Sequence, residues 1–404
     1  IVQTNNVGGE ELMKFAKRME RMQSSEIREL LKLTAQPDII SFAGGLPAPE
    51  LFPVEEYAKV AQSVIQDNGS DALQYGPTLG YIPLRTKIAE RMQKSGVQTR
   101  MEEVMVTSGS QQGLEFMAKL FIDPGDIIVC ESPSYLGAMT AFSSYEPRYI
   151  DIRTDDDGMD MEELEKALSS NDRIKFIYVI PDFQNPSGKT WSEERRIRLV
   201  ELANQYDVAI LEDNPYGELR FEGEMLPAVK HYDTEGRVVF LGTFSKIFSP
   251  GLRLGWINAS EEIIDKFNLI KQGADLQSST ISQMEIVKFM EMYDLEKHID
   301  KIKEVYKKRK DLMLAEMEKE FPASVTYTNP KGGLFVWVTL PEGVDAADIS
   351  EKALDEKVAF IIGDAFYPNG GGKNHFRMNF SNMDEERIVE GVRRLGKVLR
   401  DTLQ

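Results

Sequence analysis

Cysteine is almost absent from this sequence of 404 residues, because Cys130 is the only one. One cysteine excludes an intrachain disulfide, which is typical of a reducing compartment, so we expect a cytoplasmic protein. Long apolar runs are also absent, since none approaches the roughly 20 residues that a membrane helix needs. Residues 1–10 show no signal-peptide pattern, and we expect no membrane partner.

Histidine and positive charge are scarce as well. The three histidines, His231, His298 and His375, are far apart and lack the spacing of metal ligands, so we expect no metal site. Lys and Arg total 48 against 66 Asp and Glu, which gives a formal net charge of −18. A nucleic-acid backbone would be repelled by this charge, so we expect no nucleic-acid partner.

The remaining composition, with 42% hydrophobic and 28% charged residues, is that of a globular protein. A chain of this length is expected to form two domains. From about residue 100 to 260, short apolar runs alternate with segments of helical length, which predicts a mostly parallel sheet with helices on both faces. The predicted strands are Val104–Thr107, Ile127–Cys130, Arg148–Ile152, Phe176–Ile180, Val208–Leu211 and Val238–Leu241.

The C-terminal part has the pattern of a smaller α+β domain. A helical pattern rich in Lys and Glu predicts one long connecting helix from Ile281 to Glu320. Beyond it we expect strands at Ser324–Thr328, Gly333–Thr339 and Ala359–Ile361, and helices at Ala346–Glu356 and from Asp384 onward. The predicted large domain is 61–288, and the small domain combines 1–60 with 289–404.

The stretch 243–255 carries the strongest chemical signal. At the end of a predicted buried strand, the hydroxyls of Thr243 and Ser245 precede Lys246, and Arg253 follows after a Pro-Gly turn. A lysine amine can form a Schiff base with an aldehyde, while hydroxyls and a guanidinium can bind a phosphate. Pyridoxal 5'-phosphate, an aldehyde that carries a phosphate, needs both. An isolated Ser-Lys pair would instead indicate a surface lysine.

Polar side chains also follow other predicted strands, at the edge where ligands of such sheets bind. Ser110 and Gln111 open a helix whose N–H groups and dipole favour an anion, so we expect phosphate contacts there. Tyr135 is placed to stack on a pyridine ring, and Asp213 to hold the ring nitrogen protonated. Read singly, Tyr135 would be a core aromatic and Asp213 a turn residue.

Together these strings resemble the signature of fold-type I pyridoxal-phosphate aminotransferases, from about residue 22 to the C-terminus. The strings that begin at Arg28, Ser41 and Lys271 are similar to the branch of 2-aminoadipate, kynurenine and archaeal aromatic aminotransferases. The resemblance implies a two-step exchange of an amino group between an L-amino acid and 2-oxoglutarate. Lys246 would move the proton from the α-carbon, and Asp213 and Tyr216 would set the electronics of the cofactor.

The resemblance assigns roles to further residues. Asn185, in an Asn-Pro-Ser-Gly string, and Tyr216 are expected to bond the phenolic oxygen of the cofactor. Gly45 and Asn185 are expected on the substrate side. Arg377 is expected to grip the α-carboxylate of the substrate, with a structural salt bridge as the alternative. Tyr75, before a Gly-Pro turn, would reach the cofactor phosphate of the other subunit in a homodimer with shared active sites.

Substrate breadth requires a second, movable cation for substrates with a distal carboxylate. Arg28 is our candidate, because it lies off the apolar stripe of a short predicted N-terminal helix; the alternative is a plain surface arginine. Two other functions use this fold. A lyase or decarboxylase shares the cofactor strings. A cofactor-sensing regulatory domain would need a DNA-binding module, and only about 20 residues precede the shared region.

Overall fold

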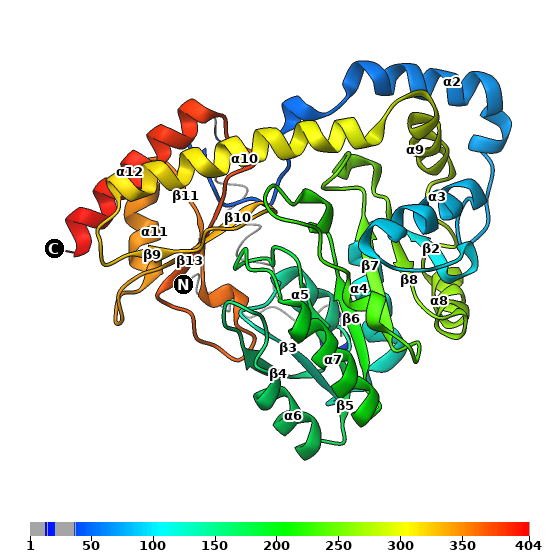
Figure 1. Ribbon diagram of the computed structural model, residues 1–404, viewed down its shortest axis with the longest axis horizontal. Coiled ribbons are helices and arrows are strands. Elements are labelled where there is room, and N and C mark those ends of the chain that lie inside the picture. Colours follow the sequence, from blue (N-terminus) through cyan, green and yellow to red (C-terminus); the bar gives the residue numbers. More distant parts are fainter. Residues whose placement is uncertain (1–12, 14, 21–35, 37, 404) are drawn as a thin grey trace.

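A seven-stranded sheet lies at the centre of the structure, a computed structural model that describes residues 13, 15–20, 36 and 38–403 (Figure 1). Within those residues the strand order is β2-β8-β7-β6-β5-β3-β4. The strands are β2 (Val104–Thr107), β3 (Ile127–Ser132), β4 (Arg148–Arg153), β5 (Ile174–Val179), β6 (Ala209–Asp213), β7 (Val238–Thr243) and β8 (Gly255–Asn258). All six predicted strands are confirmed.

β8 is the strand that the sequence does not predict. It pairs antiparallel with both β2 and β7, whereas the other neighbours in the described sheet pair in parallel. The strand has four residues and closely follows the turn at Pro250–Leu252, so it is too short to give a strand pattern of its own. The prediction of a mostly parallel sheet is confirmed.

Different helices cover the two faces of this sheet. Side chains of a strand alternate between the faces, and those of β5 pack alternately into two apolar cores. The first core includes α4 (Ser110–Phe121), α5 (Leu136–Ser143) and α8 (Glu261–Ala274); the second includes α6 (Met161–Ser170) and α7 (Glu193–Tyr206). Cys130 is fully buried in the first core.

The helical connector consists of two helices, and the prediction of one helix from Ile281 to Glu320 is wrong. α9 (Thr280–Met292) and α10 (Leu295–Glu320) are separated where Tyr293 is extended. The side chain of Asp294 accepts from two backbone N–H groups in the first turn of α10, so this residue caps a new helix. The periodic pattern continues across the break, which explains the error.

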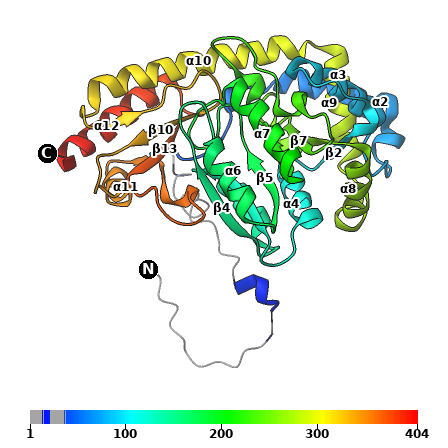
Figure 2. The same ribbon diagram turned by 60° about the horizontal axis from the view of Figure 1, so that its bottom comes forward.

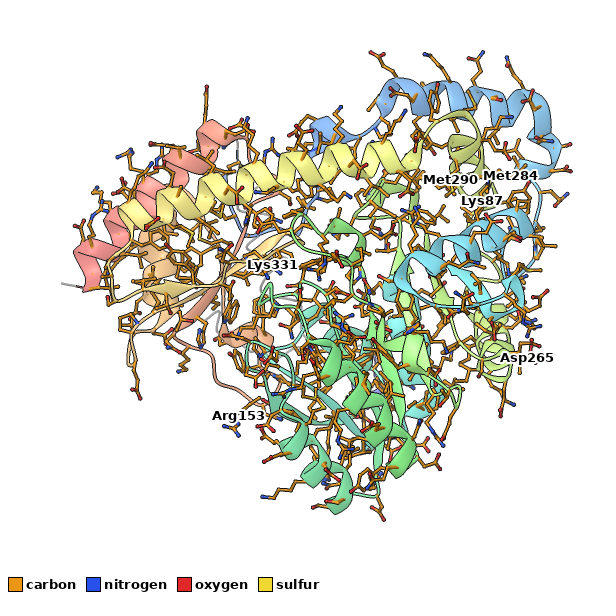
Figure 3. All side chains as sticks on the ribbon, in the orientation of Figure 1. Lys87, Arg153, Asp265, Met284, Met290 and Lys331 are labelled. Carbon is orange, nitrogen blue, oxygen red and sulfur yellow. The ribbon has the colours of Figure 1, made fainter. Side chains whose placement is uncertain are left out.

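The two helices have different roles. α9 packs against α2 (Val54–Ala72) and α3 (Ile82–Met92), and its Met284 and Met290 lie near these helices (Figure 3). α10 crosses the molecule from that end to the smaller, C-terminal part, where it packs along α12 (Glu385–Leu403) (Figures 1 and 2). α10 therefore connects the two parts of the chain, as predicted for this region.

The smaller part contains an antiparallel sheet, with described strands in the order β12-β13-β10-β9. These strands are β9 (Thr326–Tyr327), β10 (Phe335–Thr339), β12 (Ile361–Ile362) and β13 (His375–Asn379), and the helices are α11 (Ala346–Asp355) and α12 (Glu385–Leu403). The strand predicted at Ala359–Ile361 is wrong as one element, because Phe360 separates β12 from β11 (Val358–Ala359), which pairs with β1 (Ile40–Ser41). The exact domain boundaries stay a prediction.

The topology places the predicted site at one edge of the large sheet. β5, β6 and β7 are parallel neighbours, so the loops that follow Val179, Asp213 and Thr243 begin side by side. Arg377 on β13 reaches the same edge from the smaller sheet. Across the described residues, no helix has the length and apolarity to cross a membrane.

Candidate active site

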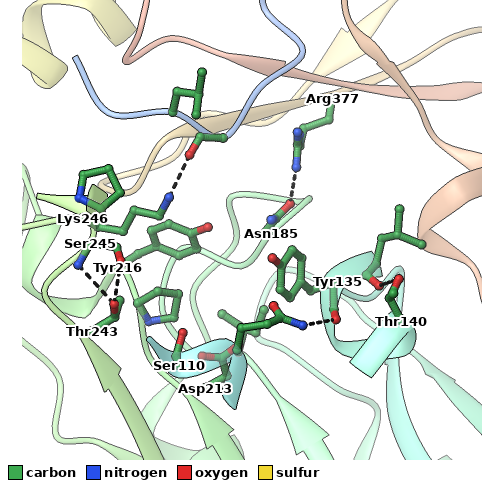
Figure 4. A pocket seen from close by; sticks show the side chains of 18 of the residues that line it. Ser110, Tyr135, Thr140, Asn185, Asp213, Tyr216, Thr243, Ser245, Lys246 and Arg377 are labelled. Carbon is green, nitrogen blue, oxygen red and sulfur yellow. Dashed lines mark hydrogen bonds between the residues drawn. The ribbon is translucent and has the colours of Figure 1, made fainter. Parts of the chain in front are cut away.

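One cavity of about 460 Å³ collects almost all of the residues singled out in the sequence (Figure 4). It lies at the carboxyl edge of the large sheet, and the smaller sheet supplies part of its wall. The predicted residues in its lining are Gly45, Ser110, Gln111, Tyr135, Asn185, Asp213, Tyr216, Thr243, Ser245, Lys246, Arg253 and Arg377. Segments that are distant in the sequence therefore meet at one place, although the role of each residue stays a prediction.

Lys246 follows the end of β7 and extends its amine into this cavity. Its Nζ donates a hydrogen bond to the backbone oxygen of Gly45 at 2.8 Å. Burial lowers the pKa of Lys246 to about 8, and the positive charges of Arg377 and Arg253 contribute in the same direction. A sizeable neutral fraction is thus present near pH 8, and a neutral amine is the form that acts as a nucleophile or a base.

The hydroxyls before Lys246 bond to each other and line the same cavity as Arg253. Thr243 Oγ1 donates to Ser245 Oγ at 3.0 Å and accepts from the Ser245 backbone N–H at 3.1 Å. Opposite them, no side chain in the described structure caps the N-terminus of α4 at Gly109. A Cβ on Gly109, whose φ is +80°, would come within 2.4 Å of Arg253 Nη2. This close approach leaves a guanidinium beside free helix N–H groups, an arrangement that suits an anion.

Asp213 is a buried carboxylate with one unused oxygen. Its Oδ2 accepts a hydrogen bond from the Tyr178 hydroxyl at 3.0 Å, whereas Oδ1 has no partner among the described residues. Burial raises the pKa of Asp213 to about 7, and the Tyr178 bond opposes that shift. A buried acceptor without a donor is costly, and a protonated ring nitrogen would supply one.

Arg377 does not form the structural salt bridge that was the alternative reading, since no described carboxylate pairs with it. Its Nη1 donates to Asn185 Oδ1 at 2.7 Å and its Nη2 to the backbone oxygen of Ala43 at 2.6 Å. The guanidinium carbon lies 4.2 Å from the ring centre of Phe335 and 5.2 Å from that of Phe366. Burial lowers the pKa of Arg377 to about 10. Neutral partners leave its charge available to a carboxylate.

Tyr216 and Tyr135 both lie in the cavity wall (Figure 4). Tyr216 is buried and packs edge-on against Phe335, with ring centres 5.9 Å apart. Burial also raises the pKa of the Tyr216 phenol, so the phenol stays protonated and can donate a hydrogen bond.

The sequence missed several cavity residues. Leu46, Leu136, Thr140 and Phe366 line the cavity, but the sequence assigns none of them a role. Tyr178, the partner of Asp213, reads in the sequence as one more apolar residue of β5. Only the pairing of β5 with β6 reveals it, because Tyr178 lies opposite Leu211 and its hydroxyl reaches Asp213, two residues farther along the neighbouring strand.

Two predicted residues are not among the cavity lining. Tyr75 is 78% exposed, and the backbone N–H of Gly76 donates to the Gln277 side chain, which fixes its loop. Arg28 lies outside the described residues.

The comparison with known proteins gives matches over nearly the whole chain. The family model for aminotransferases of class I and II matches residues 38–395. Aromatic-amino-acid aminotransferase 1 of Thermococcus litoralis is 47% identical over 96% of this chain and 95% of its own. Two crystal structures each match 96% of this chain and 98% of theirs. Kynurenine aminotransferase of Pyrococcus horikoshii, in complex with PMP, has 43% identity and a TM-score of 0.93. LysN of Thermus thermophilus, an α-aminoadipate aminotransferase complexed with N-(5'-phosphopyridoxyl)-L-leucine, has 41% identity and a TM-score of 0.89.

Proposed function

This chain belongs to the class I and II aminotransferase family, and we propose that it transfers the amino group of aromatic amino acids, 2-aminoadipate or branched-chain amino acids to 2-oxoglutarate. It is a pyridoxal-phosphate-dependent enzyme. The observation that carries the proposal is the cavity of about 460 Å³ in which Lys246 lies near two cations, Arg253 and Arg377. The names of the three relatives, which include aromatic amino acids, kynurenine and α-aminoadipate, support this range of amino donors.

The residues present fit pyridoxal 5'-phosphate. The unpaired Asp213 Oδ1 suits a protonated pyridine nitrogen. The uncapped start of α4, with Arg253 against Gly109, suits a phosphate. When bound, the cofactor supplies the electron sink that stabilises negative charge at the α-carbon of the substrate.

The contacts described above suggest what the side chains of the protein would do in the reaction. Lys246 Nζ would take the proton from the substrate α-carbon and pass it to the aldehyde carbon of the cofactor in the same half of the exchange, and would move it the opposite way in the second half. Arg377, held by Asn185 and Ala43, would bind the α-carboxylate and so orient the bond that breaks. Tyr216 would donate a hydrogen bond beside the reacting atoms.

The side-chain part of the cavity accepts apolar groups. Leu46, Leu136 and Phe366 supply apolar surface in the lining. The cations in the described lining are Lys246, Arg253 and Arg377, and each already has a proposed role. A distal carboxylate therefore needs a further cation, for which we propose Arg28 on the basis of its sequence string.

A panel of substrates tests the proposed function. We expect phenylalanine, leucine, glutamate and 2-aminoadipate each to discharge the absorbance of the bound cofactor in a half-reaction followed by stopped flow. In the Arg28→Ala variant, the Michaelis constants for glutamate, 2-oxoglutarate and 2-aminoadipate should rise on the order of tenfold, the loss of one charge-assisted bond. Those for leucine and phenylalanine should stay nearly constant.

The outcomes of this panel separate the two parts of the proposal. An equal rise of the Michaelis constants for both substrate classes in Arg28→Ala would show that Arg28 does not bind the distal carboxylate. Release of ammonia or carbon dioxide, without conversion of a 2-oxo acid into an amino acid, would replace the proposed exchange by elimination or decarboxylation.

We further propose that the active unit is a homodimer with shared sites. Exposed apolar side chains lie on α2, on the Tyr75 loop, at the start of α3 and at the end of α8, elements that gather at one end of the molecule (Figure 1). They are Val54, Ile65, Leu73, Tyr75, Ile82, Leu269 and Leu276. A second copy would bury this apolar surface and would give the exposed Tyr75 ring a partner site.

The Tyr75→Phe variant tests this sharing. It should weaken cofactor binding by about 1 kcal/mol, the value of one hydrogen bond, while sedimentation still gives a dimer. The measurement is the cofactor dissociation constant, with Tyr206→Phe on α7, which is outside the cavity lining, as the control. A fully active monomer in the sedimentation experiment would refute the proposal.

A further inference from the structure

Lys271 on α8 is fully buried, which is rare for a lysine. Its Nζ donates to Gln112 Oε1 at 2.8 Å and lies 2.9 and 3.0 Å from the two carboxylate oxygens of Asp275. The three donors of the ammonium group are thus all used. Burial lowers the pKa of Lys271, and the bonds to Asp275 oppose that shift. Asp275 is more exposed, with 29% of its side chain accessible, so the pair joins a buried ammonium to a carboxylate near the surface.

Both partners of Lys271 hold the same residue, Ser108. Asp275 Oδ2 accepts from the Ser108 hydroxyl at 3.0 Å and from Gln112 Nε2 at 2.8 Å. Gln112 Oε1 accepts from the backbone N–H of Ser108 at 3.0 Å. The side chain and the backbone of Ser108 are therefore both fixed by a network that starts at Lys271.

Ser108 directly precedes Gly109, the residue from which α4 begins. On the cavity side, Arg253 lies so close to Gly109 that a Cβ there would come within 2.4 Å of its Nη2. On the other side, the loop is held by the Lys271 network. Lys271, Asp275 and Gln112 are not among the described residues that line the cavity, so the network does not touch a ligand there.

We propose that Lys271 and Asp275 are positioning residues for the cofactor phosphate, acting through Ser108 on the first N–H groups of α4. The proposal rests on the proposed function, because it assumes that the phosphate binds at this helix start. Fixed donors bind an anion better than mobile ones, since no ordering cost is added when the ligand arrives.

Paired titrations of the full chain with pyridoxal 5'-phosphate and with pyridoxal test the proposal. Both aldehydes can react with Lys246, but only the first carries a phosphate. In Lys271→Met, which keeps much of the volume and removes the donors, the dissociation constant for the phosphorylated form should rise on the order of tenfold. The constant for pyridoxal should change less than about twofold. Asp275→Asn should also raise the ratio of the dissociation constant for pyridoxal 5'-phosphate to that for pyridoxal. It provides a second variant if Lys271→Met does not fold.

A matched control is Lys310→Met. Lys310 on α10 is similarly buried, with its Nζ 3.0 Å from Glu222 Oε1, and it is not in the described cavity lining. It reports the general cost of losing a buried lysine. Equal weakening of both ligands in Lys271→Met, or a ratio no different from that of Lys310→Met, would overturn the positioning role. A parent protein that binds both aldehydes equally well would instead overturn the phosphate site itself.

Discussion

Replacement of Lys246 by alanine is expected to lower the rate of transamination by about 10⁴-fold, the upper range for loss of a general acid–base group. Lys246 supplies the amine in the cavity, and its pKa of about 8 leaves a neutral fraction that can accept a proton near neutral pH. The variant should still bind the cofactor, because Thr243, Ser245 and Arg253 remain. Turnover at saturating cofactor, together with the cofactor retained after gel filtration, measures both effects.

Two further measurements make this test specific. Lys331→Ala, which removes an exposed lysine outside the described cavity lining, should leave turnover unchanged. A small primary amine such as ethylamine should restore part of the Lys246→Ala rate, because it can enter the space left by the side chain and move the same proton. Normal turnover in Lys246→Ala would contradict the proposed chemistry altogether.

The sequence predicts the large sheet well because its strands are separate apolar runs between helical segments. The prediction is wrong where the hydrophobic pattern continues although the helix or strand ends. The helical period continues across Tyr293 and Asp294, where the extended backbone and the side-chain cap show that a new helix begins. β8 is not predicted for a different reason, because four residues after a turn are too few to show the pattern of a strand.

The site is predictable to the extent that its residues belong to strings with a chemical signature. Lys246, Asp213 and Asn185 each have such a string, and the structure brings them to one cavity. Residues that contribute only packing or position to the site have no such string. Phe366 reaches the cavity only through the fold of the smaller sheet, and Tyr178 meets Asp213 only through the register of two neighbouring strands.

Asp213→Asn should lower turnover roughly 100-fold to 1,000-fold, the usual cost of losing one preorganised electrostatic contact. A neutral amide can still accept the Tyr178 hydrogen bond, so the strand geometry is kept. It cannot hold the pyridine nitrogen protonated, because that requires a carboxylate. Single-turnover rates at saturating cofactor measure the loss. Rates within a few-fold of the parent would exclude the proposed role of Asp213.

The same substitution should have the opposite effect on the stability of the cofactor-free protein. The pKa of Asp213 is raised from 3.8 to about 7 by burial, so the unfolded chain ionises first as the pH rises. Below about pH 4 the group is protonated in both states and costs nothing. Between its two pKa values the penalty grows, and above pH 7 it is complete. Asp213→Asn should therefore raise the melting temperature at pH 8, with a gain that shrinks toward pH 4.

Glu212, the neighbouring residue on β6, provides the contrast. Burial raises the pKa of Glu212 to about 7 as well, so the difference lies in its oxygens, which accept from the backbone N–H groups of Val229 and Lys230 at 2.9 and 2.8 Å. In Glu212→Gln an amide N–H₂ would face one of those donors, so this variant should melt at a lower temperature and keep its turnover per bound cofactor. Lower stability of Asp213→Asn at pH 8 would show that Asp213, like Glu212, supports the fold. The expected opposite signs would identify Asp213 as a carboxylate whose burial costs stability and whose unused oxygen serves the cofactor.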